Sequence, residues 1–246
     1  MIPCKLTVLT RLGLLLCLPG LVGWSPLVRV IPTASPSLVS VTFPPTTDRG
    51  APERSTGGGT RRGGTCGMVA EESVSETLIA LAPSNNAIKT LAPNPSIYIY
   101  VPSFPEKEAR FQLFDRDRKV VIYEETLTLT GESGLLKISL PTTVALMPET
   151  QYEWSFSVIC NPDDFEQDRF VEGWIERVPL DTDIQAQVDN IDTPLDKAQI
   201  YATQELWYET LEILLSQRDE NPTAWLEFVN SVNLSPEIAS SPVVEF

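Results

Sequence analysis

Between residues 77 and 178, short runs rich in Val, Ile, Thr and aromatic side chains alternate with clusters of Pro, Gly, Asn and Asp. Such runs favour β-strands, and the clusters between them favour turns. About seven strands at this spacing, with no helical pattern between them, predict an antiparallel immunoglobulin-like or fibronectin-like β-sandwich. The expected strands cover residues 77–81, 96–101, 110–114, 120–130, 135–140, 152–160 and 170–178, with hairpin connections at 115–119 and 131–134.

The run at 152–160 shows the clearest alternation. Apolar residues occupy every second position from Tyr152 to Cys160, and mainly Glu and Ser stand between them. A period of two places one face of the strand in the core and the other in water. Upstream, Leu146 and a proline precede Tyr152. This arrangement resembles a tyrosine corner, in which the Tyr hydroxyl bonds back to the backbone a few residues earlier.

From residue 181 onward the period becomes helical. Asp181 can cap a helix that runs through Val188, and Thr193 followed by Pro194 opens a longer helical pattern, either one helix or two over 194–217. We expect a short C-terminal helical tail whose apolar stripe packs on the sandwich, so that the fold is mainly β. The alternative is a helix face that grips a partner. The stripe consists of Ile200, Trp207, Leu211 and Leu214, followed by Trp225, Phe228 and Val229.

The first 24 residues predict an export signal. Lys5 and Arg11 precede an apolar run at 12–22, which is the pattern of a signal peptide. The run is too short for a transmembrane helix, which needs about 20 apolar residues. We therefore expect a periplasmic or secreted protein that is not an integral membrane protein once the signal is removed.

Composition divides the rest of the chain into four parts. Residues 25–65 are rich in Pro, Ser, Thr and Gly, which predicts a disordered linker because little apolar surface can be buried there. The alternative is a basic arm that docks on the acidic domain or on an anionic partner. The β-sandwich domain is then expected at 66–180, the helical tail at 181–235 and a flexible C-terminus at 236–246.

Charge and histidine content exclude several classes of function. Residues 67–246 contain 11 Lys or Arg and 31 Asp or Glu, so this part of the chain repels phosphate backbones and is not expected to bind nucleic acid. The sequence has no histidine. Catalysis by Ser-His-Asp or Cys-His sets is thereby excluded, as are the commonest zinc ligands.

The cysteines agree with export. Cys4 and Cys17 fall in the expected signal, which leaves Cys66 and Cys160 as one possible disulfide pair in a compartment that permits disulfides. Closing a loop of that length stabilises a fold by about 4–5 kcal/mol in the chain-entropy model. Two free or buried thiols are the alternative.

Carboxylates provide the remaining candidates for chemistry. Glu172 and Glu176 flank Trp174, but four residues along one strand span about 13 Å, and paired glycosidase carboxylates lie about 5–9.5 Å apart. An acidic loop could offer oxygen ligands to calcium, although it lacks the glycine turn of a helix-loop-helix calcium site. Its carboxylates are Asp163, Asp164, Glu166 and Asp168.

Several separated stretches together resemble one family. They are residues 50–66, with Gly-Gly-Thr60-Arg, and residues 78–83, 95–102, 152–162, 171–177 and 200–211. Over residues 50–235 the chain is similar to the cyanobacterial family called domain of unknown function 928. The resemblance implies an exported protein with no assigned activity, cofactor or catalytic residue, so no site residue is carried over. The family often has a glycine-containing break before the Trp207 motif, where this chain has Thr203-Gln-Glu205.

Taken together, these features favour a non-enzymatic extracytoplasmic protein-interaction or envelope-associated module with an unknown protein or envelope partner. The possible interaction surface comprises Glu172, Trp174, Glu176, Trp207 and Trp225. The rival hypothesis is a carboxylate-dependent hydrolase of glycans or esters, and a third is a structural component of the periplasm. No catalytic or cofactor-binding residue is predicted, and calcium at the acidic loop is the one cofactor considered.

Overall fold

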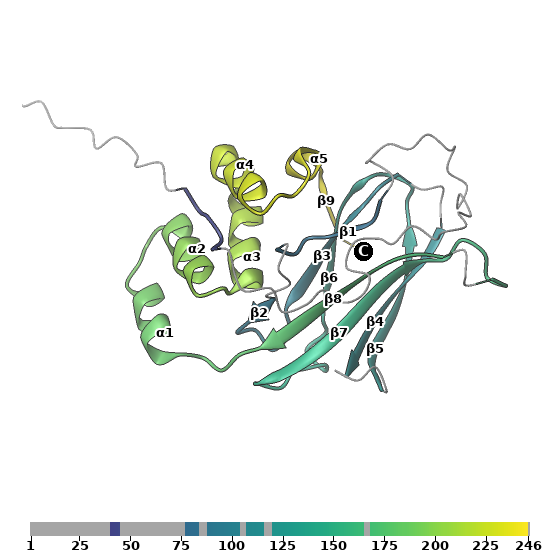
Figure 1. Ribbon diagram of the computed structural model, residues 1–246, viewed down its shortest axis with the longest axis horizontal. Coiled ribbons are helices and arrows are strands. Elements are labelled where there is room, and N and C mark those ends of the chain that lie inside the picture. Colours follow the sequence, from purple (N-terminus) through teal and green to yellow (C-terminus); the bar gives the residue numbers. More distant parts are fainter. Residues whose placement is uncertain are drawn as a thin grey trace, which may run out of the picture. The chain divides into compact units, whose positions relative to one another are not determined.

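The computed structural model describes residues 40–44, 77–83, 88–103, 107–115, 120–164 and 168–245, all within the compact unit Leu38–Phe246 (Figure 1). The strands in these ranges are β1 (Ile79–Ala80), β2 (Lys89–Thr90), β3 (Ser96–Val101), β4 (Lys107–Asp115), β5 (Val121–Leu129), β6 (Gly134–Ser139), β7 (Thr150–Val158), β8 (Arg169–Arg177) and β9 (Val243–Glu245). The helices are α1 (Thr182–Asp189), α2 (Pro194–Thr203), α3 (Trp207–Gln217), α4 (Pro222–Ser231) and α5 (Pro236–Ser240).

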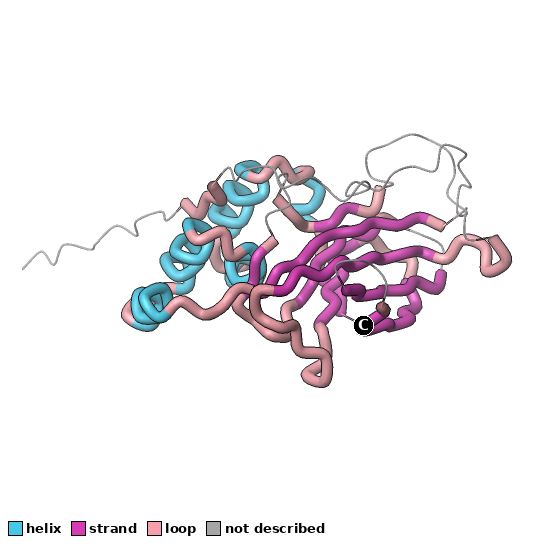
Figure 2. Tube along the Cα trace, turned by 60° about the horizontal axis from the view of Figure 1, so that its bottom comes forward, coloured by secondary structure: helices cyan, strands magenta, loops and turns pink. Residues whose placement is uncertain are grey.

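The strands form two mixed sheets (Figure 2). A four-stranded sheet has the order β1-β3-β6-β9, and a five-stranded sheet has the order β2-β8-β7-β4-β5. Neighbouring strands are antiparallel except β6 with β9 and β2 with β8, which are parallel. The mainly β class with helices towards the C-terminus is confirmed, but the sheets are not purely antiparallel as predicted. The strands β2 and β9 are only two and three residues long, too short for alternation to reveal them.

The two predicted hairpins have different outcomes. The strands β4 and β5, which flank 115–119, pair antiparallel. The strands β5 and β6, which flank 131–134, belong to different sheets, so the prediction of a hairpin there is wrong. Alternation places one face of each strand in the core, but it does not determine which sheet the strand joins. Gly131, with φ of 94°, allows the sharp change of direction between the sheets.

Both sheets contribute to one hydrophobic core. Every second residue of β7 from Tyr152 to Val158 is buried, as the alternation predicts. The prediction that the other face lies in water is wrong for Glu153 and Ser155, which are 7% and 5% exposed, because the neighbouring strands β4 and β8 flank them. The strand β3 is buried on both faces because the four-stranded sheet is covered on both sides. The Tyr98 hydroxyl donates a hydrogen bond to Glu212 of α3, so the tyrosine face of β3 is turned towards the helices.

The predicted tyrosine corner is present before β7. The Tyr152 hydroxyl accepts a hydrogen bond from the Met147 N–H at 2.9 Å. The adjacent Leu146 is 1% exposed, and its carbonyl accepts a hydrogen bond from the Arg177 guanidinium at 2.6 Å. The turn that enters β7 is therefore attached both to its own strand and to the end of β8.

The helix boundaries follow the sequence signals. Asp181 caps α1 by accepting from two backbone N–H groups of the first turn, and Pro194 is the first residue of α2. The region left open at 194–217 forms two helices, with the break at 204–206. Glu205 has φ of 60°, the left-handed conformation that favours glycine. Its carboxylate forms an ion pair with Lys89 at 2.6 Å, which links the break to β2.

Both ends of the described chain differ from expectation. Val41 and Phe43, in the predicted linker, are 0% and 6% exposed, and the Phe43 ring contacts Trp207 edge-on at a centroid distance of 5.0 Å. The segment 236–246, predicted to be flexible, contains α5 and β9, which pairs with β6. Val41, Phe43 and Ile238 gain a place in the core through partners far away in the sequence.

Candidate functional site

The five-stranded sheet has an inner face that packs in the core and an outer face on the opposite side. Along each strand, successive side chains point to these two faces in turn. The predicted surface residues Glu172, Trp174 and Glu176 lie on the outer face of β8, since the residues between them are buried. We call the region around the indole the Trp174 face. It comprises Phe114, Gln151, Glu153, Ser155, Glu172, Trp174 and Glu176, which the strand register brings together.

Glu153 lies at the centre of this face. The register places it between Phe114 of β4 and Trp174 of β8, in one row across the strands. Directly opposed residues of antiparallel strands have Cβ atoms about 4.5–5.5 Å apart. Glu153 is 7% exposed and Phe114 is 8% exposed, whereas Trp174 is half-buried. The indole is therefore the member of this row that reaches solvent.

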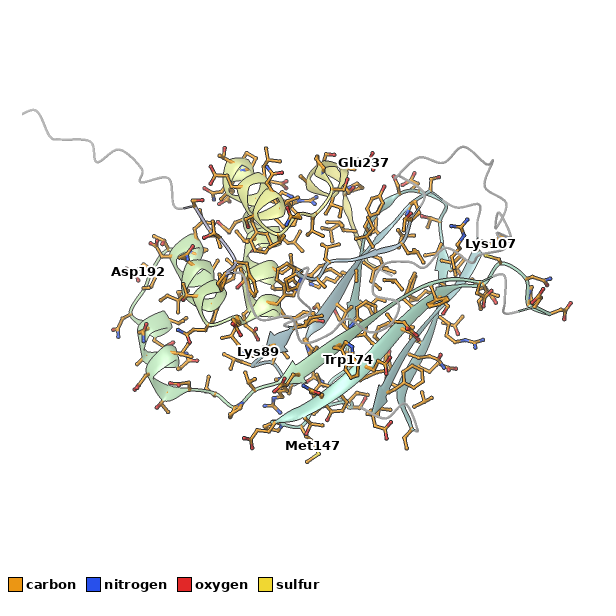
Figure 3. All side chains as sticks on the ribbon, in the orientation of Figure 1. Lys89, Lys107, Met147, Trp174, Asp192 and Glu237 are labelled. Carbon is orange, nitrogen blue, oxygen red and sulfur yellow. The ribbon has the colours of Figure 1, made fainter. Side chains whose placement is uncertain are left out.

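Two further carboxylates flank Trp174 along its own strand. Glu172 and Glu176 lie two residues before and after it, which places all three side chains on the same face. The Gln151 amide donates a hydrogen bond to Glu176 at 3.1 Å. The Trp174 Nε1 atom is buried and has no hydrogen-bond partner among the described residues. The result is an indole with three carboxylates around it, held on adjacent long strands. Figure 3 labels Trp174.

This arrangement suits cation binding better than glycoside hydrolysis. A cation over an indole ring gains about 0.5–2 kcal/mol, and neighbouring carboxylates add to the attraction. Glu172 and Glu176 are about 13 Å apart along β8, beyond the spacing of a glycosidase pair. Glu153 is diagonal to both, but at 7% exposure it leaves no room for a sugar and an attacking water molecule.

The two predicted surface tryptophans of the helical tail are core residues. Trp207 is 0% exposed and donates its indole N–H to the Leu81 carbonyl at 2.9 Å. Trp225 is 3% exposed and donates to the Ala239 carbonyl at 3.0 Å. Both contact Phe228, with centroid distances of 5.3 and 6.1 Å. The aromatic stripe thus packs inward as expected, and these two residues do not belong to an exposed surface.

Sequence reasoning missed Glu209, a buried carboxylate in the first turn of α3. Its Oε1 atom accepts hydrogen bonds from the Thr90 hydroxyl at 2.8 Å, the Leu91 N–H at 2.7 Å and the Ala92 N–H at 3.2 Å. Its Oε2 atom is buried and has no hydrogen-bond partner within the described ranges. Burial raises the pKa of Glu209, against the opposing effect of these hydrogen bonds. The helical period of the sequence does not reveal that Glu209 contacts residues 90–92, at the end of β2 and just after it.

Glu209 belongs to a structural connection. Together with the Trp207–Leu81 hydrogen bond and the Glu205–Lys89 ion pair, it joins the start of α3 to segments of the β-domain. All three residues lie in or next to the motif that carried the family resemblance at 200–211. This motif therefore holds the helices on the sheets, and no reacting group is needed to explain it.

The predicted calcium loop is only partly described. Asp168 is 9% exposed, and its Oδ1 accepts a hydrogen bond from the Cys160 N–H at 3.0 Å. Burial raises the pKa of Asp168, while the Cys160 hydrogen bond and the Arg110 charge oppose this shift. Glu166 lies outside the described residues, and within them no three acidic or cysteine side chains converge on a possible metal position. Calcium at Asp163, Asp164, Glu166 and Asp168 stays a prediction.

A hollow of about 550 Å³ lies among the helices, away from the Trp174 face. It is lined by Trp225, Leu226 and Pro236, with Arg218 and Asp219 at its polar side. Asp219 is its one carboxylate among these lining residues, so the hollow lacks the acidic pair that the hydrolase hypothesis requires.

No helix in the described parts of the chain combines the length and the apolar character needed to cross a membrane.

A family model described as "Domain of Unknown Function (DUF928)" matches residues 56–243. No curated protein matches the chain. Among solved structures, astrotactin-2, described as a vertebrate-specific and perforin-like membrane protein involved in neuronal development, aligns over 67% of this chain and 37% of its own, with 12% identity and a TM-score of 0.24.

Proposed function

Since the chain belongs to the DUF928 family, whose activity is not assigned, we propose a function from its surface: it is a non-enzymatic extracytoplasmic protein-interaction module that binds a cationic partner. The observation that carries this proposal is the half-exposed Trp174 with Glu153, Glu172 and Glu176 around it. The export signal expected in the first 24 residues supports a periplasmic or secreted location, and therefore a partner in the envelope.

The face suits an Arg- or Lys-bearing partner for two reasons. The indole offers a ring face to a cation, and the carboxylates lower the energy of a positive charge beside it. The excess of acidic residues in 67–246 also steers basic partners towards the domain. Because β7 and β8 pair along nine residues each, the side chains are held in place before a partner arrives.

Replacing Trp174 with alanine is expected to weaken binding of a flexible arginine–glycine peptide by about five- to tenfold, because the cation–π contribution is lost. Fluorescence anisotropy with the full chain at low salt measures this. Glu172→Gln is expected to weaken binding about threefold. Its matched control is Glu227→Gln, which removes the same charge from an exposed position on α4.

Equal weakening by Glu172→Gln and Glu227→Gln would show that net charge, and not this face, attracts the peptide. Turnover of a glycan or ester that Glu172→Gln abolishes would instead establish the hydrolase hypothesis.

We also propose that Cys66 and Cys160 form a disulfide. In its support, Cys4 and Cys17 fall in the expected signal, so Cys66 is the cysteine expected to remain with Cys160 after signal removal. The purified protein is expected to have a mass lower by two hydrogens before reduction, and to take up two alkylating groups only after reduction. Alkylation of Cys160 without reductant would contradict the pairing. The Cys66→Ser variant serves as control, because it leaves one reactive thiol in the mature chain.

A further inference from the structure

The strand β5 forms one edge of the five-stranded sheet. In the order β2-β8-β7-β4-β5 it pairs with β4, and no other described strand lies beside it. It is nine residues long and contains no proline. Ile122, Glu124, Thr126 and Thr128 are exposed along it, so the strand is open to solvent over its length.

The hydrogen-bond pattern shows which backbone groups of β5 point outward. The Ile159 N–H donates to the Glu108 carbonyl on the β7 side of β4, and the Asp115 N–H donates to the Val120 carbonyl on the β5 side. In an antiparallel ladder successive residues bond to alternate sides. The odd-numbered residues of β4 therefore bond to β5, and their register partners include Glu125 and Leu127.

It follows that the residues between these partners turn their backbone groups away from the sheet. Glu124, Thr126 and Thr128 present N–H and C=O groups in the plane of the sheet, at the spacing with which a further strand would pair. Sheet edges of natural proteins are usually shortened, bulged or interrupted by proline. β5 carries one bulge, at Ile122, which the register skips between Tyr123 and Val121. From Tyr123 to Leu129 its pairing with β4 is regular and contains no proline.

The side chains at this edge combine apolar and acidic character. Val120, Val121 and Ile122 are 56%, 47% and 38% exposed at the start of the strand. Glu124 accepts a hydrogen bond from the Gln112 amide at 2.6 Å, and Glu125 accepts one from the Tyr123 hydroxyl at 2.9 Å. Burial and the Glu125 carboxylate raise the pKa of Tyr123 to about 12, which keeps this hydroxyl protonated. Both donors are neutral, and within the described residues no ion pair joins a cation to Glu124 or Glu125, so the middle of the edge carries two carboxylates.

We propose that β5 is a docking edge for an extended basic segment of another polypeptide, which adds a strand to the five-stranded sheet. Its backbone would pair with Glu124, Thr126 and Thr128. Because strand side chains alternate between faces, its Lys or Arg side chains would lie on the exposed face near Glu124, and its aliphatic side chains would lie on the opposite face beside Tyr123. A second copy of this chain fits less well. Antiparallel pairing of two β5 strands would bring four carboxylates into one short ladder, between two acidic domains.

The proposal concerns a surface other than the Trp174 face, so each can fail without the other. The probe is a labelled nine-residue peptide that alternates valine and lysine, matched in length to β5, and its control alternates valine and glutamate. Thr126→Pro removes an outward N–H and leaves the β4 ladder intact, since proline is tolerated where the N–H of an edge strand faces solvent. Thr126→Val keeps the N–H and is the matched variant.

We expect the valine–lysine peptide to bind the full chain and the valine–glutamate peptide to bind at least tenfold more weakly. Thr126→Pro is expected to weaken binding at least tenfold, Thr126→Val less than twofold and Trp174→Ala less than twofold. Circular dichroism verifies that each variant is folded. If Thr126→Pro fails to fold, the pair Glu124→Lys and Glu125→Lys still tests the edge, because reversing both charges is expected to transfer the preference to the valine–glutamate peptide.

Equal binding to Thr126→Pro and Thr126→Val would overturn the proposal, as would an unchanged preference after charge reversal. A dimer of the full chain, detected by light scattering and abolished by Thr126→Pro, would overturn it in favour of a second copy as the occupant.

Discussion

Replacing Gly173 with alanine is expected to lower the free energy of unfolding by about 3 kcal/mol, near the upper end for an overpacked core position. Gly173 lies directly opposite Trp154 in the β7–β8 ladder. A Cβ atom at this position would lie within 2.8 Å of three atoms of the Trp154 ring. Trp154 is 1% exposed and stacks on Phe111 at a centroid distance of 6.2 Å, so the ring has no free space to move into.

Urea unfolding of the Gly173→Ala variant measures the loss. The informative control is the same substitution in a Trp154→Phe background, where the smaller ring frees part of the volume. We expect alanine to cost at least about 1 kcal/mol less there, which a double-mutant cycle resolves. An identical cost in both backgrounds would show that the ring is not the source of the strain. Gly173 precedes Trp174 in the sequence, but the structure requires a glycine there because of the Trp154 ring on the inner face of the sheet.

Replacing Glu209 with alanine is expected to lower the free energy of unfolding by about 3 kcal/mol as well. The Thr90 hydroxyl and the N–H groups of Leu91 and Ala92 lose their common acceptor. A buried donor without a partner costs about 1–3 kcal/mol. Glu209→Gln keeps an acceptor oxygen for the three donors, so the free energy of unfolding is expected to fall by only about 1 kcal/mol. This smaller cost arises because the amide NH₂ group takes the place of Oε2, which has no hydrogen-bond partner among the described residues. The exposed Glu227→Ala on α4 is expected to change stability by less than about 0.5 kcal/mol.

The raised pKa of Glu209 adds a pH dependence with a definite sign. Because the folded-state pKa lies above the ordinary value of 4.5, the folded protein holds this proton more tightly than the unfolded chain. The stabilisation by this group is complete below about pH 4.5 and is lost as the pH rises through the folded pKa. The advantage of the wild type over Glu209→Gln is therefore expected to be largest at acidic pH and to shrink towards neutrality.

Urea unfolding of both proteins over a series of pH values tests this, because titrations common to both cancel in the difference. An advantage that grows towards neutral pH would show that the charged carboxylate is the stabilising form. Equal losses for Glu209→Gln and Glu209→Ala would show that the three donors do not depend on this acceptor.

Local patterns were sufficient for most individual elements. The seven predicted runs all contain strands. In β4 and β8 the burial of one strand face produces an alternation that is visible within the run, whereas β3 is recognisable only by its β-forming residues. The cap at Asp181, the start of α2 at Pro194 and the corner at Tyr152 depend on residues within five positions of each other. Thr193 occupies the cap position of α2 without a capping hydrogen bond from its side chain. Membership of the family was likewise recognisable from separated motifs.

The candidate site was predicted in part, for the same reason. Alternation along β8 places Glu172, Trp174 and Glu176 on one face, which needs no knowledge of other strands. It does not place Glu153 opposite Trp174, because that contact depends on the register between two strands. Helical period identified Trp207 and Trp225 as one apolar stripe, but whether such a stripe binds a partner or the rest of the chain depends on what packs against it.

By itself, then, the sequence determined the mainly β class, the positions of the long strands to within a few residues, the starts of α1 and α2, the acidic character and the grouping of Glu172, Trp174 and Glu176, since all of these follow from near neighbours. Tertiary structure decided the mixed sheets, the crossing from β5 to β6, the open edge of β5, the Gly173–Trp154 contact and the burial of Glu209. Each of these joins segments that are distant in the sequence, and only packing in three dimensions selects which of the compatible surfaces meet.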